Sequence, residues 1–455
     1  MFTDFEIKGQ WFLPNDSENA VIGTLKFQVG KDISLETIGS LSGHDEDPEI
    51  ILGISTDGHL YTLVDSLTVR SRDSSRGIST RAYSVHEMIK NGHFTSLDAL
   101  QFDHVHFQYN LFEEWLGKSV FDINESFENR TFEVKVNEPD SIEFSIDDIT
   151  KGQIHFYRTN LLRQRLQKKI EIEQENVLAL EFTQLISLKS LLEYQHKFQN
   201  FLTLATAENV FPKRIDAWNT YDENQDQSLE IYFIPYAKGK TSTESKIDRF
   251  MLFTYSDIEN RFESILKNWF LKCDELQPVI FLLFNNLYNK SKFSSFSFLG
   301  IIQSLETFHR YLIPIPNSNI QKHEERVKRI SDSLTGKDKR WVKFKLKYAF
   351  EPSLQDRLNY ILDNYPTEIV LKLIGNRDEF IRSVVNDRNF YTHYDKRLEK
   401  TKMDMPELMR ITGILQLLLI SSILVEIGFD QNQVSQIHKN GRHVNHLVKQ
   451  ISKKG

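Results

Sequence analysis

The chain of 455 residues contains one cysteine, Cys273. A single thiol excludes an intramolecular disulfide framework and a zinc site that uses several thiolates. We expect Cys273 to be a small buried apolar residue, the common role of an isolated cysteine. The chain also lacks any long low-complexity tract, and its residues are 40% hydrophobic and 26% charged. This composition favours two or three packed domains over a disordered or fibrous protein.

Long hydrophobic runs are absent as well. Residues 1–9 alternate charged and apolar side chains, so no signal peptide is expected there. The longest apolar stretch lies between Arg410 and Glu426 and holds 15 residues. A membrane-spanning helix needs about 20 such residues. We therefore expect a buried helix at this position, and a soluble cytoplasmic protein without a membrane partner.

The net charge of −7 is unevenly distributed along the chain. Residues 1–157 contain 27 acidic and 12 basic side chains, a net charge of −15, and residues 158–455 carry a net charge of +8. Residues 318–350 contain ten Lys or Arg against four acids, and residues 431–455 contain five Lys or Arg, three His and no acid. An acidic region beside a basic one suggests that the basic part meets polyanions. The alternative is that each basic segment is a solvated helix face.

The sequence predicts an α+β multidomain protein with three regions. Residues 1–157 form a β-rich domain, a sandwich or barrel-like sheet, because alternating runs rich in aromatic and β-branched residues recur between turn signals. Residues 158–255 form a mixed α/β region, and residues 256–455 form an all-α helical bundle with prolines at its joints. The segment 137–140 predicts a hairpin turn between its neighbouring strands. Strands are expected at 23–29, 50–55, 59–69, 104–109, 131–136, 141–146 and 229–235, and helices at 184–209, 275–290, 294–313, 318–333, 338–350, 353–364, 367–387 and 405–428.

Common catalytic and metal-binding motifs are missing. Gly239–Thr241 follows a predicted strand, but Ile234 stands where a phosphate-binding loop requires its first glycine. His438, His443 and His446 cluster without a nearby carboxylate or cysteine, so we expect a basic, solvated helix and not a metal site. The sequence therefore predicts neither a metal nor a cofactor.

An arginine and a histidine five residues apart occur twice, as Arg388–His393 and as Arg81–His86. The bare spacing is expected by chance in a chain of this composition, so its context must decide. The first pair lies in the helical region and the second in the acidic β-rich region. We interpret the second pair as a chance match.

The segment 388–397, RNFYTHYDKR, resembles the signature of the HEPN superfamily of helical ribonucleases, in which Arg is followed by a polar residue, often Asn, and then by His. It is similar to the form found in ApeA-type abortive-infection proteins. Residues 298–310 resemble an early helix of that domain and include the acidic residue Glu306. Trp11 followed by Gly23–Leu25 resembles the opening of the ApeA N-terminal domain. The resemblance implies a C-terminal HEPN ribonuclease, a symmetric homodimer with a composite site, and a regulatory N-terminal domain.

The residue types suit this chemistry. RNA can be cleaved without a metal when its 2′-hydroxyl attacks the adjacent phosphorus, which gives a 2′,3′-cyclic phosphate and a 5′-hydroxyl. Histidine can transfer protons near neutral pH, and arginine offers a permanent charge and a fork of donors to phosphate oxygens. One histidine cannot easily act on both sides of the phosphorus. Two copies of His393 across a symmetric dimer interface would solve this.

Geometry constrains the pair. Five residues of unbroken helix turn by about 500°, which leaves the side chains of Arg388 and His393 ~140° apart. We therefore expect the helix to end or bend between them, with Thr392 capping a new start. The alternative is that both residues only complete a helix near its C-terminus. Glu306 is expected to point partly into the bundle and to pair with Arg388, and the alternative partner is Arg310 at the surface.

The predicted function is a metal-independent endoribonuclease of anti-phage abortive-infection defence, with Arg388 and His393 as catalytic residues. Glu306, Asn389 and Tyr391 are expected to support the site, the last two by hydrogen bonds to phosphate or to a flipped base; the alternative for Tyr391 is packing. By family analogy the substrate is RNA, with the anticodon loop of transfer RNA as one candidate, and a phage-derived trigger acts on the N-terminal domain. The alternative function is a non-catalytic module that binds RNA or a phage protein. The residues expected to contact RNA are Lys339, Arg340, Lys343, Lys439 and Arg442.

Overall fold

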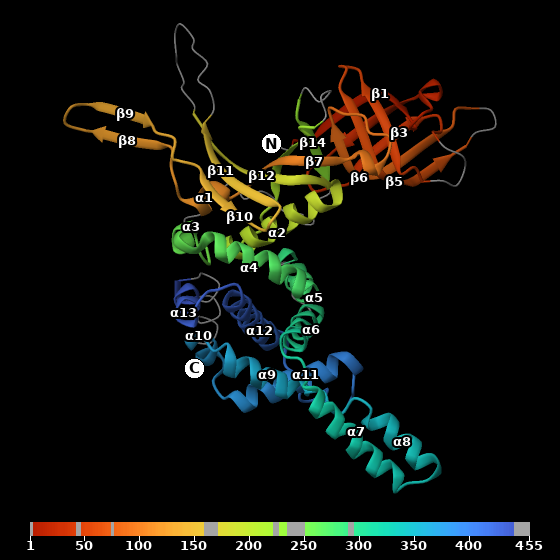
Figure 1. Cartoon of the computed structure of the whole chain (residues 1–455), viewed down its shortest axis with the longest axis vertical. Coiled ribbons are helices and arrows are strands. Elements are labelled where there is room, and N and C mark those ends of the chain that lie inside the picture. The colour runs from red at the N-terminus through yellow and green to blue at the C-terminus, as the bar shows by residue number, and fades with distance from the viewer. Residues whose placement is uncertain are drawn as a thin grey trace. The chain divides into compact units, whose positions relative to one another are not determined.

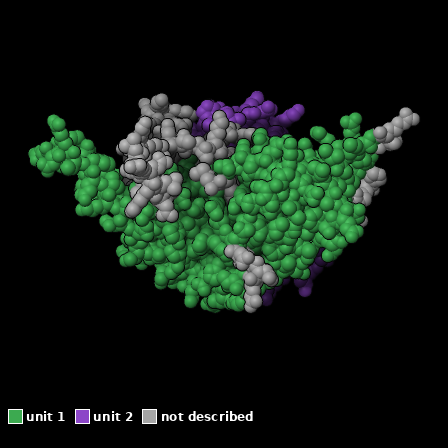
Figure 2. Space-filling model, turned by 90° about the horizontal axis from the view of Figure 1, so that it is seen from above, with its two compact units in different colours: residues 1–267 green, residues 268–455 purple. Residues whose placement is uncertain are grey.

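The computed structural model describes residues 3–41, 47–73, 77–158, 172–221, 227–233, 251–289 and 295–440. It divides into two compact units, residues 1–267 and 268–455, which Figure 2 draws in green and purple. The described part of unit 1 contains all the strands, and the described part of unit 2 is helical. The predicted fold class, a β-rich N-terminal part followed by a helical bundle, is confirmed.

Six of the described strands of unit 1 close into an antiparallel barrel (Figure 1). Neighbouring strands pair in the order β1-β2-β3-β6-β5-β4, and β4 pairs back with β1. The closure depends on β6, which pairs with β3 on one side and with β5 on the other. The bounds are β1 (Phe5–Phe12), β2 (Val21–Phe27), β3 (Ile33–Ile38), β4 (Ile50–Ser55), β5 (Leu60–Arg72) and β6 (Thr80–Lys90).

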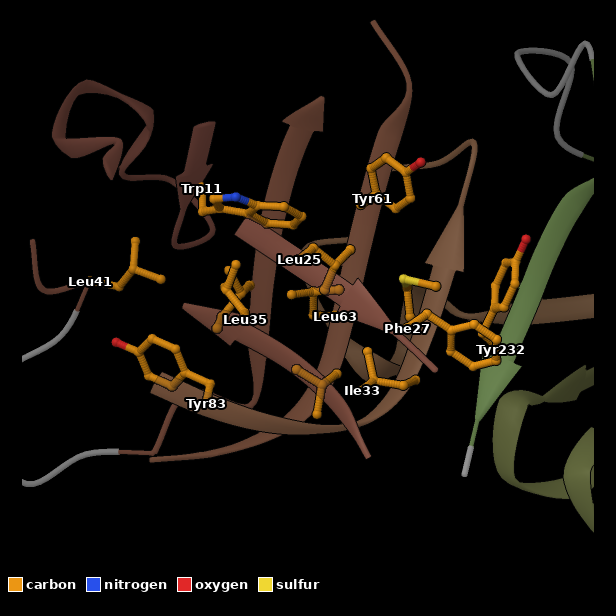
Figure 3. Packing of buried hydrophobic residues seen from close by; sticks show 13 residues of the cluster. Trp11, Leu25, Phe27, Ile33, Leu35, Leu41, Tyr61, Leu63, Tyr83 and Tyr232 are labelled. Atoms are coloured by element: carbon orange, nitrogen blue, oxygen red, sulfur yellow. The ribbon is translucent and has the colours of Figure 1, made fainter. Parts of the chain in front are cut away.

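Apolar side chains fill the barrel interior. They come from every second residue of the strands, because successive side chains of a β-strand point to opposite faces. Figure 3 shows Trp11, Leu25 and Leu63 in this interior. Trp11 is fully buried, and two glycines make room for its indole. A Cβ on Gly53 would lie 2.2 Å from the ring, and one on Gly23 would lie 2.8 Å from it. The Trp11 and Gly23 positions singled out in the sequence thus belong to one packing arrangement.

The sheet continues from β6 beyond the barrel in the order β14-β13-β7-β12-β11-β10. Helix α2 (Leu188–Thr206) packs on β7 and β12 through its buried face, and the Ser187 side chain caps it by accepting from the Ser190 N–H. Strands from the predicted mixed region, 158–255, therefore join the same sheet as strands from residues 1–157. The bounds are β7 (Gln101–Tyr109), β10 (Ile142–Ser145), β11 (Thr150–Arg158), β12 (Gln174–Ser187), β13 (Pro212–Trp218) and β14 (Leu229–Phe233).

Strands β8 (Phe121–Ser126) and β9 (Thr131–Val136) form a separate two-stranded hairpin that projects from the large sheet in Figure 1. The prediction that 131–136 pairs with 141–146 is wrong, because β9 pairs with β8 and β10 pairs with β11. The true turn, 127–130, contains no Gly or Pro and reverses with Arg130 at a positive φ of 50°. The proline-containing segment 137–140 is a connection between two hairpins.

The described helices match most of the predicted ranges, with two corrections. Residues 184–187, predicted to begin the helix 184–209, are instead the end of strand β12. The predicted helix 367–387 is two helices, because Gly375 has a φ of +67° and ends the first one. The Asn376 side chain then accepts from the Glu379 N–H and begins the second. The bounds are α1 (Phe112–Leu116), α3 (Tyr255–Ile258), α4 (Phe262–Glu275), α5 (Gln277–Tyr288), α6 (Ser295–Leu312), α7 (Asn317–Asp332), α8 (Gly336–Leu346), α9 (Leu354–Asn364), α10 (Glu368–Ile374), α11 (Arg377–His393), α12 (Met405–Glu426) and α13 (Gln431–Asn440), with short 3-10 turns at Ser17–Asn19, Leu97–Ala99 and Glu259–Arg261.

Helix α12 is the central apolar helix of unit 2. At 22 residues, with a mean hydropathy of 2.0 over its most apolar window, it is long and apolar enough to cross a membrane, but 72% of that window is buried inside the structure. This burial is typical of a core helix, so the predicted buried helix is confirmed. Cys273 on α4 is also buried, as predicted.

Candidate functional site

Helices α6 and α11 bring Glu306 and Arg388 together, although 82 residues separate them in the chain. Arg388 donates from Nη2 to Oε1 of Glu306 over 3.0 Å, and the two side chains are 28% and 29% exposed. The predicted pairing is confirmed. The alternative partner, Arg310, pairs instead with Glu351 at 2.7 Å. A charged hydrogen bond of this kind at partial burial fixes the direction of the guanidinium.

Asn389 holds the same guanidinium from a second side. Arg388 donates from Nη1 to Oδ1 of Asn389 over 3.1 Å, while its buried Nε has no hydrogen-bond partner among the described residues. The polar residue that follows the arginine therefore acts on the arginine itself. Part of the guanidinium remains exposed and able to meet an anion.

A second arginine lies behind Glu306 and was not predicted. Arg357 on α9 is almost fully buried, and its Nη1 lies 3.4 Å from the carbonyl oxygen of Glu306 and 3.2 Å from Nδ1 of His309. Burial lowers the pKa of His309, and the charge of Arg357 lowers it further. Arg357 ties α9 to α6 beneath the site. The sequence signal was present, because Arg357 falls on the same helical face as the buried Leu354, Leu358 and Ile361.

Helix α11 is unbroken from Arg377 to His393, so the predicted end or bend between Arg388 and His393 is wrong. The helix stops one residue later, where Tyr394 adopts a positive φ of 49° and donates its N–H to the Phe390 carbonyl over 2.6 Å. Thr392 lies inside the helix and does not cap a new one. The side chains of Arg388 and His393 consequently leave α11 ~140° apart.

His393 is exposed in the last turn of α11. Asp395 lies nearby, and its pKa is lowered to about 2, mainly by the hydrogen bond from Arg397 and to a smaller extent by the charge of His393. The imidazole is therefore open to solvent while Arg388 faces α6. Within one chain the two residues of the motif do not converge on a single point.

Tyr391, between Arg388 and His393, and Asp387, just before Arg388, anchor helix α11. Tyr391 packs edge-on against Phe298 of α6 at 6.2 Å between ring centres, and burial raises the pKa of its hydroxyl. Asp387 is buried, and its carboxylate accepts from the Met403 N–H at 3.0 Å. Burial raises the pKa of Asp387. These contacts attach α11 to α6 and fix the segment that follows His393.

The other Arg–His pair has a different geometry. Arg81 and His86 lie on β6, where residues five apart point to opposite faces of the sheet. Arg81 is buried and pairs with Asp73 at 2.8 Å, whereas His86 is exposed. Because Arg81 is buried and paired with Asp73, its guanidinium is less accessible to a phosphate than that of the partly exposed Arg388.

Some of the cations expected to contact RNA are paired with acidic side chains, and others are exposed. Lys339 on α8 pairs with Asp332 at 3.0 Å, and Lys439 on α13 pairs with Glu368 at 2.7 Å. Arg340 and Lys343 on α8 are exposed. Arg442 lies outside the described residues, as do Gly239–Thr241 and the segment after residue 440.

His438 contradicts the prediction of a solvated basic helix. It is fully buried, and its Nε2 lies 2.8 Å from Oγ of Ser421 on α12. Burial lowers its pKa to about 4. His443 and His446 lie outside the described residues. In the part of the chain that the structure describes, no group of three or more His, Cys, Asp or Glu side chains is placed to hold a metal ion.

The fold and the Glu306–Arg388 site define a two-part protein in which a barrel-containing sheet unit precedes a helical unit with an R-x4-H helix. Comparison with protein families agrees: ApeA N-terminal domain 1 matches residues 6–269, and Apea-like HEPN matches residues 299–433. The first match covers more than half of the chain, and the chain belongs to the ApeA family of antiphage-defence HEPN nucleases. HEPN domains are generally ribonucleases and typically dimerise. No curated protein and no solved structure matches the chain.

Proposed function

We propose that this protein is a metal-independent endoribonuclease in which Arg388 and His393 carry the chemistry. The observation that supports this most is the Arg388 guanidinium, held by Glu306 at 3.0 Å and Asn389 at 3.1 Å inside the HEPN-matched region. A guanidinium oriented in advance stabilises negative charge on phosphorus without having to reorganise during the reaction.

The proposed reaction is a transfer within the RNA. One imidazole removes the proton of the 2′-hydroxyl, the O2′–P bond forms, the P–O5′ bond breaks, and a second imidazole gives its proton to the departing 5′-oxygen. The products are a 2′,3′-cyclic phosphate and a 5′-hydroxyl. Arginine supplies the positive charge and histidine the proton transfers, so the scheme requires no metal ion.

Two protomers are proposed to build the site. Because α11 is unbroken, Arg388 and His393 of one chain diverge. The exposed His393 can instead meet its counterpart across a two-fold axis, which places two imidazoles on one RNA strand. The proposed assembly is therefore a homodimer with a composite active site.

The proposed substrate is cytoplasmic RNA, with transfer RNA anticodon loops as one candidate, and the proposed trigger is a phage-derived component that acts on unit 1. The charge distribution supports regulation by the acidic first part of unit 1, because residues 1–157 carry a net charge of −15 and residues 158–455 carry +8. An acidic surface and RNA would compete for the same basic side chains, so cleavage by the purified protein is expected to be slow and to rise when the trigger intervenes.

The test uses purified full-length protein and total RNA. Arg388→Ala and His393→Ala should each abolish cleavage, whereas the matched control Arg382→Ala, an exposed arginine on the same helix, should leave it unchanged. EDTA should have no effect. Cleavage that EDTA abolishes, or that survives His393→Ala, would refute the proposal. RNA binding without cleavage under every condition would favour a non-catalytic binding module.

A further inference from the structure

Helix α8 exposes three aromatic side chains along one line. Trp341, Phe344 and Tyr348 are 62%, 76% and 62% exposed. They stand at positions i, i+3 and i+7, and at 100° per residue they share one stripe, with Tyr348 just past the last helical residue. Contiguous exposed aromatic side chains of this size usually mark a binding surface.

Cations are interleaved with the aromatic rings. Lys337 and Lys345 fall on the same face of α8, and Arg340 and Lys347 fall at its edge. All four are exposed, and Nζ of Lys347 lies 4.8 Å from the centre of the Tyr348 ring. Lys339 points the other way and pairs with Asp332 of α7 at 3.0 Å. Of these four cations beside the aromatic stripe, only Arg340 is among the residues that the sequence predicted to contact RNA.

In the described part of unit 2, the aromatic stripe is exposed and is not used for packing. Helices α7 and α8 form a hairpin that projects from the other helices of this unit in Figure 1. Contacts on the opposite face of α8 hold the hairpin together, since His323 of α7 contacts the Leu346 carbonyl oxygen at 2.7 Å and the Phe350 ring at 5.5 Å. The aromatic face is left open to a partner.

We infer that this face of α8, the residues Lys337, Arg340, Trp341, Phe344, Lys345, Lys347 and Tyr348, binds single-stranded RNA. Unpaired bases stack on the three rings while the cations meet the phosphates, which is how proteins hold single strands without reading their sequence. The inference rests on the proposed ribonuclease function and narrows its substrate class to RNA with unpaired bases, because a duplex keeps its base faces hidden.

Charge and spacing favour RNA over the other possible occupants. Residues 318–350 contain ten Lys or Arg against four acids, so two such hairpins from two copies of the chain would repel one another. A helix rises 1.5 Å per residue, so the stripe from Trp341 to Tyr348 is roughly 10 Å long, which suits two or three successive bases. An acidic protein surface would satisfy the cations but would leave the aromatic rings without partners for stacking.

The test measures binding separately from cleavage. The probe is a labelled oligouridylate of twelve nucleotides with 2′-O-methyl groups, which cannot attack phosphorus, and binding is read by fluorescence anisotropy with full-length wild-type protein. The triple variant Trp341→Ala, Phe344→Ala, Tyr348→Ala keeps every charge and should weaken binding at least about tenfold, as expected from the loss of base stacking. The matched control is Phe296→Ala, which removes an 80% exposed aromatic ring from α6 and should bind as the wild type does.

A second readout is the fluorescence of Trp341 in the wild-type protein. Trp341 is the exposed tryptophan, since Trp11, Trp115 and Trp269 are buried and Trp218 is half-buried. Bound single-stranded probe should quench its fluorescence, and a duplex of equal length should quench it far less. Trp341→Phe should retain most of the affinity because phenylalanine still stacks.

The outcomes separate the inference from the proposed function. Unchanged affinity of the triple variant, or equal affinity for duplex and single strand, would overturn the inference even if the protein cleaves RNA. A triple variant that loses its dimeric state in light scattering but keeps its affinity would also overturn it and would assign the stripe to a contact between copies. Aromatic-dependent binding without any cleavage would support the inference and refute the nuclease.

Discussion

Acid is expected to destabilise the helical unit through one buried imidazole, that of His438. Ser421 donates its only hydroxyl proton to the Leu417 carbonyl oxygen at 2.7 Å, so Nε2 of His438, 2.8 Å from the same hydroxyl oxygen, must be the donor. The buried Nδ1 then carries no proton and has no hydrogen-bond partner among the described residues. Protonation would place a charge and an N–H where the described structure offers no acceptor.

The size of the effect follows from the pKa. Burial lowers the pKa of His438 from its ordinary value of 6.5 to about 4. The unfolded chain therefore binds this proton first as the pH falls. The contribution of His438 to folding stability is complete above pH 6.5 and is lost as the pH falls from 6.5 to about 4. A difference of this size corresponds to about 3 kcal/mol of stability.

The assay is urea unfolding at several pH values between 7 and 4, followed by far-ultraviolet circular dichroism, in which helices dominate the signal. The variant His438→Gln keeps a donor for Ser421 and does not titrate, so its stability should fall less than that of the wild type over this pH range. Carboxylates titrate equally in both proteins and cancel in the comparison. His393→Gln, which removes an exposed histidine, is the matched control and should follow the wild type. Equal pH dependence of the wild type and His438→Gln would refute the reasoning.

Three further sets of substitutions test the site and the fold. Glu306→Gln should lower kcat by about tenfold with little change in KM, because the amide keeps an acceptor but loses the charge that orients the guanidinium of Arg388. An equal loss in Glu306→Asp, which retains the charge, would argue against an electrostatic role. Arg81→Ala and His86→Ala should each leave cleavage within a few-fold of the wild type, and loss of activity in either would show that the wrong pair was chosen. Gly53→Ala should destabilise unit 1 by about 1–3 kcal/mol, since its Cβ would lie 2.2 Å from the Trp11 ring, and a thermal melt with an unchanged midpoint would contradict that packing.

The sequence predicted the local structure well where the pattern is local. The helical period of residues 256–440 and the alternation in strands such as β2 and β9 could be recognised because each element carries its own signal. Closure of the barrel could not be predicted from the sequence, since it depends on β6 pairing with both β3 and β5. Strand pairing between distant segments leaves no mark in either segment alone. The break at Gly375–Asn376, by contrast, is a cap signal that local reasoning can recognise.

The candidate site was predicted in part for a physical reason. Glu306 on a mainly apolar helix face required a partner of opposite charge, which led to Arg388. The position of His393 was misjudged, because the demand for convergence within one chain suggested a helix break that the backbone does not make. The burial of His438 could not be foreseen, since a short polar helix reveals its buried side only when its partner, α12, is in place.

The central claim is that Arg388 and His393 cut RNA by attack of the 2′-hydroxyl without a metal ion, and the ends of the cleaved RNA test it most directly. Purified full-length protein is incubated with RNA in EDTA, and the termini of the fragments are determined by end-specific labelling and mass spectrometry. The account predicts 2′,3′-cyclic phosphate and 5′-hydroxyl ends with the wild type and with Arg382→Ala, and no fragments with Arg388→Ala or His393→Ala. Fragments with 5′-phosphate ends, or the same fragments from His393→Ala, would contradict it.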